Sequence, residues 1–220
     1  MAVRLGTLLL SLFLLFGFLT ASFIHYLNKW KKPFNMRNMF PYEINYDGNF
    51  FDNGWGNIFM ILMVASLGAY FILFNLDFNS TFFLPVKIIG IIAILIIPLE
   101  IIVPLKYLKI HIGVVVAQFF STMSLSASIA ITALRTYQTY DMSALPIVIL
   151  ILASVMTIMI LWLAFNPKLS LRIMYDKTIN EKGEEVVSRP KVIVLAFTEW
   201  ILIFSVFVDA ILMFVLMFSF

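Results

Sequence analysis

The sequence contains no cysteine. Disulfide bonds, thiolate nucleophiles and cysteine-ligated zinc or iron–sulfur centres are therefore excluded, because each of them needs a cysteine sulfur. Charged residues are scarce as well, at 12% of the 220 residues, and only two histidines are present. No HxxxH, HExxH or paired-aspartate spacing occurs. Such spacings mark metal sites and metallohydrolases, so we expect no metal and no cofactor, and the chain leans away from an enzyme.

Apolar residues are abundant instead. They make up 62% of the chain, and the mean hydropathy is +1.02. Both values lie far outside the usage of soluble globular proteins. Apolar stretches of about 20 residues, the length that crosses a bilayer core, recur along the whole chain. The sequence predicts an all-α, polytopic integral membrane protein with a single transmembrane domain over residues 1–220 and no nucleic-acid partner.

We predict a bundle of six transmembrane helices with a structured first loop. The approximate spans are 6–26, 56–76, 85–105, 111–134, 144–165 and 192–220. The first span is too long for a signal-peptide core and has no clear cleavage site, so we expect it to be retained. The connections 27–55 and 166–191 are long, and the second of them contains "EKGEE" (181–185), which predicts a hairpin.

Lysine and arginine are distributed unevenly between the two ends of these spans. Three of the 15 fall beside the even-numbered connections or the N-terminus, namely Arg4, Lys87 and Arg135. The other 12 fall in the first, third and fifth loops: Lys29, Lys31, Lys32, Arg37, Lys106, Lys109, Lys168, Arg172, Lys177, Lys182, Arg189 and Lys191. Because positive loops favour the cytoplasm, this count predicts cytoplasmic odd-numbered loops and both termini outside.

Four titratable residues fall near the ends of spans that meet at the face of the odd-numbered loops. They are His25, Glu100, His111 and Glu199. One interpretation is a polar site, in which these groups bind a metal or supply general acids and bases, with His111, Glu100 and Glu199 as weak catalytic candidates. The other is interfacial anchoring beside aromatic residues, which we favour for His25 and Glu199.

Glu100 and two further polar positions are expected to be buried. They are Glu100, Gln118 and Asp209, the last about 15 Å deeper along its span than Glu199. A buried carboxylate needs a partner or must be neutral, because a charge at bilayer depth costs a few kcal/mol. Lys106 or Lys109 is a candidate partner for Glu100.

Span 111–134 also carries small residues at intervals of three and four. They are Gly113, Ala117, Ser121, Ser124, Ser128 and Thr132. Such a stripe lets another helix approach closely and offers hydroxyls for interhelical hydrogen bonds. A polar pore lining is the competing interpretation. We favour helix packing, and we expect this span to be the buried central helix.

The first loop mixes turn-forming residues with aromatic ones in "MFPYEINYDGNFFDNGWGN", residues 39–57. A flexible linker would not need so many aromatic residues, so we predict a compact structure covering the odd-loop face. Its residues expected to recognise a lipid or a partner protein are Tyr42, Glu43, Asp47, Asp52 and Trp55.

Three motifs recur in the order of a known family. The first loop contains "FPYEINYDG" (40–48), the fourth span begins with "HIGVVVAQF" (111–119), and the last begins with "FTEWILIFS" (197–205). This order resembles the DRAM/Frag/Sfk (damage-regulated autophagy modulator-like) family of six-span membrane proteins and covers most of the chain. The chain departs from the family at 43–45, where Glu-Ile-Asn replaces a Ser-Asp pair, and it lacks an Asn-Phe element near the end of the third span.

The resemblance implies a membrane organiser or adaptor. Family members include autophagy modulators of lysosomal membranes, regulators of phosphoinositide kinase localisation and a remodelling factor for GPI-anchored proteins. The resemblance also implies a first loop facing the lumen or exterior and cytoplasmic termini, which is opposite to the orientation that the Lys and Arg count predicts.

Three functions follow as hypotheses. The first, which we favour, is a non-enzymatic membrane organiser that binds membrane lipids, a membrane-protein partner or a second copy of itself. The second is an intramembrane lipid-modifying enzyme that uses Glu100, His111 and Glu199. The third is a cation channel or transporter with Glu100 and Asp209 along its path. The membrane would be a plasma membrane or endomembrane, or the cell membrane of a prokaryote.

Overall fold

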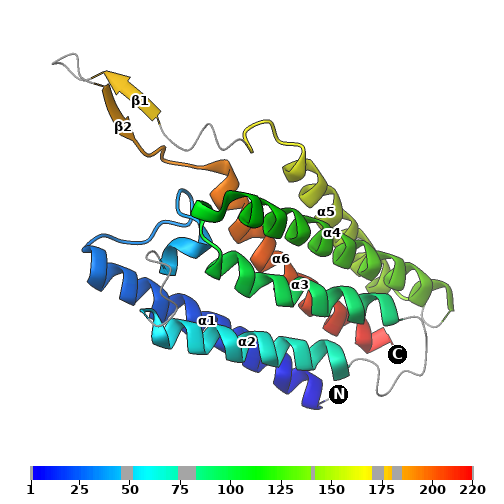
Figure 1. The fold of residues 1–220 in the computed structure, drawn as a ribbon. Helices are drawn as coiled ribbons and strands as arrows, with labels where there is room; N and C mark the ends of the chain where they lie inside the picture. The colour runs from blue at the N-terminus through cyan, green and yellow to red at the C-terminus, as the bar shows by residue number, and fades with distance from the viewer. Residues whose placement is uncertain are drawn as a thin grey trace.

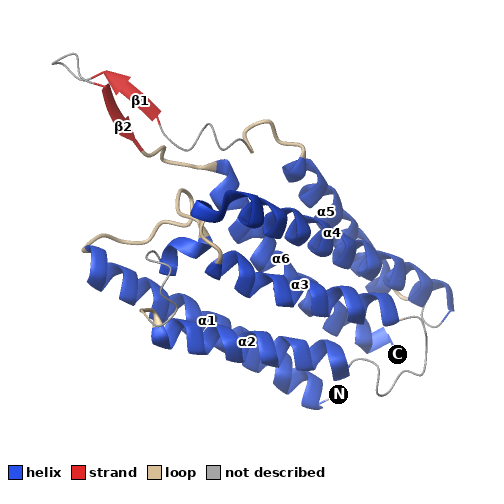
Figure 2. Cartoon of the chain, viewed as in Figure 1, coloured by secondary structure: helices blue, strands red, loops and turns tan. Residues whose placement is uncertain are grey.

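The computed structural model describes residues 2–45, 52–73, 83–139, 142–169, 176–179 and 185–219. Within these ranges the α-helices are α1 (Ala2–Trp30), α2 (Gly54–Leu73), α3 (Leu84–Ile102), α4 (Leu108–Thr139), α5 (Ala144–Ala164) and α6 (Val194–Leu216). These six helices are long and apolar enough to cross a membrane. The predicted all-α, six-span bundle is therefore confirmed (Figure 2).

Two helices are longer than the predicted spans. α1 has 29 residues and α4 has 32, against the roughly 20 that a bilayer core requires. The extra turns carry Lys and Gln, which are good helix formers in water. At the end of α1, Lys31 has a φ of 54°, the left-handed conformation that often terminates a helix, and its N–H donates to the Leu27 carbonyl at 2.9 Å.

The long fifth loop contains the two described strands. β1 (Asp176–Ile179) pairs antiparallel with β2 (Glu185–Ser188), and Ile179 lies opposite Glu185. The hairpin extends beyond one end of the helices, and both chain termini lie at the other end (Figure 1). The predicted "EKGEE" turn itself falls mostly on residues outside the described ranges.

α6 is the central helix of the bundle. It contacts α1, α3, α4 and α5, and 67% of its most apolar window is buried, against 44% for α4. The prediction that span 111–134 is the buried centre is therefore wrong. α6 is mostly apolar around its circumference, as a largely surrounded helix must be, whereas a larger share of α4 is exposed. One polar contact ties α6 to α2, where the Tyr70 hydroxyl donates to the Ala210 carbonyl at 2.8 Å.

The first loop folds back over the end of the bundle as a short structured segment, residues 33–45, which we term the cap. It ends in a 3-10 helix, Pro41–Asn45, that contacts α1, α3 and α6. Phe40 is fully buried against Ile193 and Ala196 of the α6 end. The last residue of the cap, Asn45, exchanges amide hydrogen bonds of 3.2 and 3.3 Å with Asn57 of α2.

Three backbone-directed hydrogen bonds join the cap to the segment that leads into α6. The Ile193 N–H donates to the Arg37 carbonyl at 2.8 Å, and the Asn38 amide donates to the Pro190 carbonyl at 3.1 Å. The indole N–H of Trp200 donates to the Met39 carbonyl at 2.9 Å. The first and fifth loops therefore form one structure at this end, as their location on the same membrane face allows.

Candidate functional site

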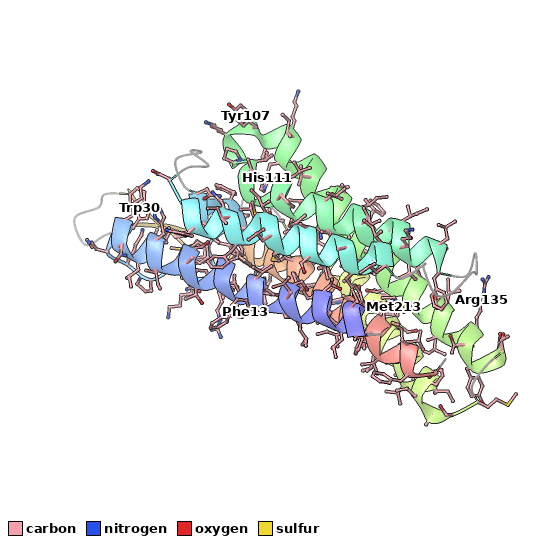
Figure 3. The ribbon with its side chains drawn as sticks, turned by 90° about the horizontal axis from the view of Figure 1, so that it is seen from below. Phe13, Trp30, Tyr107, His111, Arg135 and Met213 are labelled. Atoms are coloured by element: carbon pink, nitrogen blue, oxygen red, sulfur yellow. The ribbon has the colours of Figure 1, made fainter. Side chains whose placement is uncertain are left out.

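The first turns of α4 and α6 bring a histidine and a glutamate together beneath the cap. His111 Nε2 lies 3.2 Å from Glu199 Oε1, and the two side chains are 1% and 0% exposed. His111 Nδ1 lies 2.8 Å from the carbonyl of Val103, just after α3. Figure 3 places His111 close to Tyr107 at one end of α4, with Arg135 toward the other. Three helices thus contribute to a single polar contact.

The hydrogen bonds of His111 fix where its protons lie. A carbonyl oxygen only accepts, so Nδ1 must carry a hydrogen and donate it to Val103. Nε2 and Glu199 Oε1 then share one proton, as an imidazolium and carboxylate or as an imidazole and carboxylic acid. In either form both ring nitrogens of His111 are occupied.

Aromatic rings of the cap cover the histidine. The ring of Tyr42 meets the His111 ring edge-on, with centroids 5.5 Å apart and an interplanar angle of 81°. The ring of Phe40 meets it at 6.3 Å and 80°. Tyr42 and Phe40 stack on each other at 5.7 Å. The predicted structure over the odd-loop face therefore lies directly against His111.

A groove of about 730 Å³ opens beside this pair, between α4, α5 and α6. Its polar end is formed by His111 and Glu199. The rest of the lining is apolar: Ile112, Val115, Val116, Phe119, Phe120, Met123, Ile160, Leu161, Ala164, Phe165, Leu169 and Leu195. Several of these side chains also face outward, such as Phe120 at 61% and Phe165 at 80% exposure. The groove is therefore open to the hydrocarbon side of the bundle.

At the polar end of the groove, one of the two carboxylate oxygens of Glu199 has no hydrogen-bond partner among the described residues. Oε1 is bound to His111, whereas Oε2 is buried and has no hydrogen-bond partner among the described residues. Leaving a buried acceptor unsatisfied costs about 1–3 kcal/mol. Because Oε2 is closed off from the groove surface, this cost belongs to the protein interior beside the groove.

An ion pair between Glu43 and Arg189 holds the cap to the fifth loop. The Arg189 guanidinium donates to both carboxylate oxygens of Glu43, at 2.8 and 2.7 Å, and the backbone N–H of Phe40 donates to the same carboxylate at 2.7 Å. Glu43 is 4% exposed. Both oxygens of this predicted recognition residue are thus used to hold the cap to the chain just after β2.

The other predicted recognition residues do not share one surface. Asp47 lies outside the described residues. Asp52 and Trp55 lie at the start of α2, where a second groove of about 640 Å³ runs between α1 and α2 and includes His25. Asp52 forms an ion pair with Lys29, and this hydrogen bond and the lysine charge lower the pKa of Asp52. Of the predicted set, Tyr42 and Glu43 alone belong to the cap.

The deeper polar residues are fully buried but line neither groove. The Ser126 hydroxyl donates to Asp209 Oδ2 at 2.7 Å, and the Gln118 amide donates to the hydroxyl of Thr122 at 3.1 Å. Glu100 is 0% exposed, and neither of its oxygens has a hydrogen-bond partner among the described residues. The structure shows no ion pair within its described part between Glu100 and the exposed Lys106 or Lys109. The electrostatic neighbour of Glu100 is Glu199.

The small-residue stripe of α4 is only partly turned inward. Gly113 and Ala117 are exposed, and a Cβ added to Gly113 would meet nothing within 4 Å. Within the described part of one chain these two positions pack against no other helix, so the packing role of the stripe there stays a prediction. Farther along, Ser121 and Thr132 are buried, and Ser124 and Ser128 are half-buried. The helix buries an adjacent strip instead: His111, Val115, Gln118, Thr122, Leu125, Ser126, Ile129 and Ala133.

Sequence reasoning missed three parts of the site. Arg189 was counted only as a loop charge, although it is the partner of Glu43. The Val103 carbonyl carries no sequence signal beyond its place before Pro104 at the end of α3. The α5 wall of the groove, including Ile160 and Phe165, is indistinguishable from any other apolar helix face in the sequence.

No group of three or more His, Asp or Glu side chains that could hold a metal ion occurs in the part of the chain that the structure describes. No family model, curated protein or solved structure matches the chain. The fold and the apolar helices define the class, a polytopic integral membrane protein. The resemblance to the DRAM/Frag/Sfk family stays a prediction.

Proposed function

We propose that the protein is a non-enzymatic membrane organiser that binds a lipid in the groove between α4, α5 and α6. The observation that carries this proposal is an apolar groove that ends on a buried His–Glu pair with one unsatisfied carboxylate oxygen. A lipid chain would lie along the apolar walls. The polar head of the lipid would lie at the end that His111 and Glu199 form.

The size and the walls of the groove suit such a ligand. Its volume of about 730 Å³ falls inside the range of roughly 300–1,000 Å³ that ligand sites usually occupy. Its walls are formed by aliphatic and aromatic side chains, and its few polar atoms gather at one end. That arrangement orients an amphipathic molecule with its head at the membrane face and its chain toward the membrane interior.

The environment of His111 favours binding over chemistry. A general base must present a free nitrogen to the proton it removes. Both ring nitrogens of His111 are engaged, by Val103 and by Glu199, and the cap rings hold the imidazole in place. This geometry supports a recognition site that is already formed before a ligand enters.

Filling the groove tests the proposal. Val116 lines the groove and is 45% exposed, so Val116→Trp should occupy it without disturbing the core. We expect at least a tenfold fall in the lipid that stays bound through detergent purification, measured by native mass spectrometry. Ile151→Trp is the matched control, because Ile151 of α5 is 55% exposed and outside the groove lining. Equal lipid retention by both variants would contradict the proposal.

A second candidate is a lipid-modifying enzyme in which the His111–Glu199 pair acts on the bound lipid. The observation in its favour is that the pair itself lines the groove. Glu100, the third residue of that hypothesis, does not line it. Incubation of the purified protein with radiolabelled membrane lipids decides between the lipid-binding and the enzymatic function. Product formation that His111→Gln abolishes, with lipid binding retained, would replace the binding proposal by the enzymatic one.

A further inference from the structure

Three lysines lie close in sequence to residues that line the groove. Lys109 lies two residues before His111, Lys168 directly precedes Leu169, and Lys191 lies four residues before Leu195. His111, Leu169 and Leu195 all line the groove. The three lysines are exposed. Lysine stems are long and flexible, so their ammonium groups can gather where the headgroup of a bound lipid would lie.

The described carboxylates at this end are engaged elsewhere or buried. Glu43 pairs with Arg189, Asp52 with Lys29 and Glu199 with His111, and Glu100 is fully buried. Lys109, Lys168 and Lys191 form no ion pair with any side chain that the structure describes. Among the described side chains, three lysines without an ion-pair partner therefore lie close in sequence to the lining of an apolar groove.

We infer that the groove selects an anionic phospholipid. Its phosphate would be held by Lys109, Lys168 and Lys191, and its chain would lie against α4 and α5. The inference rests on the proposed lipid-binding function and adds the class of lipid. Charge complementarity decides against a zwitterionic lipid such as phosphatidylcholine, which has no net charge.

The expected effect follows from the strength of such contacts. One lysine near an anionic lipid surface contributes roughly a fivefold gain in binding. Removal of all three charges should therefore weaken binding by on the order of 100-fold. Since the lysines are exposed, added salt should also weaken binding of the anionic lipid by the wild type.

The test measures lipid binding by the full-length protein in detergent, with phosphatidylglycerol, phosphatidic acid, phosphatidylethanolamine and phosphatidylcholine as probes. The variant is Lys109→Gln with Lys168→Gln and Lys191→Gln. The matched control removes three exposed charges at the same membrane face but away from the groove lining: Lys31→Gln with Lys32→Gln and Arg37→Gln. We expect the wild type and the control to prefer the two anionic lipids, and the groove variant to lose that preference.

The outcomes separate this inference from the function on which it rests. Equal binding of all four lipids, abolished by Val116→Trp, would overturn the anionic preference and leave the lipid-binding proposal standing. Binding that Val116→Trp does not change would overturn both. An equal loss in the control variant would assign the effect to general surface charge and overturn the inference. Competition by inorganic phosphate as effective as that by anionic lipid would do the same, since the ligand would then be a soluble anion.

Discussion

At the scale of single residues, the bundle is organised by polar groups that lipid cannot satisfy. A buried side-chain donor or acceptor is stabilised by a partner inside the protein, because leaving it without one costs about 1–3 kcal/mol. Asp209 finds one in Ser126, whose hydroxyl lies 2.7 Å from Oδ2 and joins α4 to α6. The other oxygen of Asp209, Oδ1, has no partner among the described residues. The bond from Ser126 is therefore the one side-chain hydrogen bond of Asp209 within the described part of the chain.

Replacing this serine should therefore destabilise the bundle. We expect Ser126→Ala to lower the free energy of unfolding by about 1–3 kcal/mol, because it leaves the Asp209 carboxyl without a donor. Equilibrium unfolding in mixed micelles measures the change. Ser124→Ala is the matched control, a half-buried serine of the same helix, and should change stability by less than about 0.5 kcal/mol. Equal losses in the two variants would show that the Ser126–Asp209 contact carries no special weight.

At the scale of elements, the cap depends on contacts between two loops that are distant in sequence. The Glu43–Arg189 pair joins the first loop to the fifth, and backbone hydrogen bonds at Arg37 and Met39 support it. Tyr42 and Phe40 then lie against His111. The order of the cap therefore controls how firmly the polar end of the groove is covered.

Loss of the Glu43–Arg189 ion pair should make the cap less ordered without unfolding the helices. Glu43→Gln removes the charge of a residue that is 4% exposed, while Arg189 stays part-exposed. Loss of one partner from a buried pair costs about 3–5 kcal/mol, and solvent around Arg189 reduces this to an expected ~1–3 kcal/mol. Hydrogen exchange of residues 37–45 should accelerate by about tenfold or more, since 1.4 kcal/mol corresponds to a factor of ten.

Two comparisons make this result specific. Asp52→Asn removes the exposed pair with Lys29 at the same membrane face, and exposed pairs contribute less than about 1 kcal/mol, so exchange of the cap should stay unchanged. The charge swap Glu43→Arg with Arg189→Glu should restore part of the protection. Unaltered exchange of 37–45 in Glu43→Gln would mean that the backbone contacts alone order the cap.

At the scale of the whole molecule, the sequence predicts the number and approximate position of the spans because these depend only on local hydropathy. How far each helix is rotated about its axis depends on its neighbours, and the sequence does not contain that information in readable form. Ser126 and Gly113 illustrate the limit. Both are small residues of one helix, but Ser126 is buried against Asp209 and Gly113 is exposed. The groove was missed for the same reason, since Val116 and Ile160 become walls only when α4 and α5 are in register.

The orientation of the bundle is the last property that the charge distribution predicts. The cap, the hairpin and the lysines around the groove all lie at the face of the odd-numbered loops. The excess of Lys and Arg at this face predicts that it is cytoplasmic. An anionic lipid in the groove would then belong to the cytoplasmic leaflet, which in many membranes is the negatively charged one.

Single cysteines can test this orientation, since the native chain has none. Lys32 is exposed just beyond the end of α1, and Met142 is 79% exposed between α4 and α5 at the opposite end of the bundle. In intact cells, an impermeant maleimide should label Met142→Cys and leave Lys32→Cys unlabelled until the membrane is permeabilised. The reverse pattern would place the cap and the lysines outside, as the resemblance to the DRAM/Frag/Sfk family implies. Labelling of both positions only after permeabilisation would place the protein in an internal membrane, where isolated vesicles of known sidedness would replace cells in the same assay.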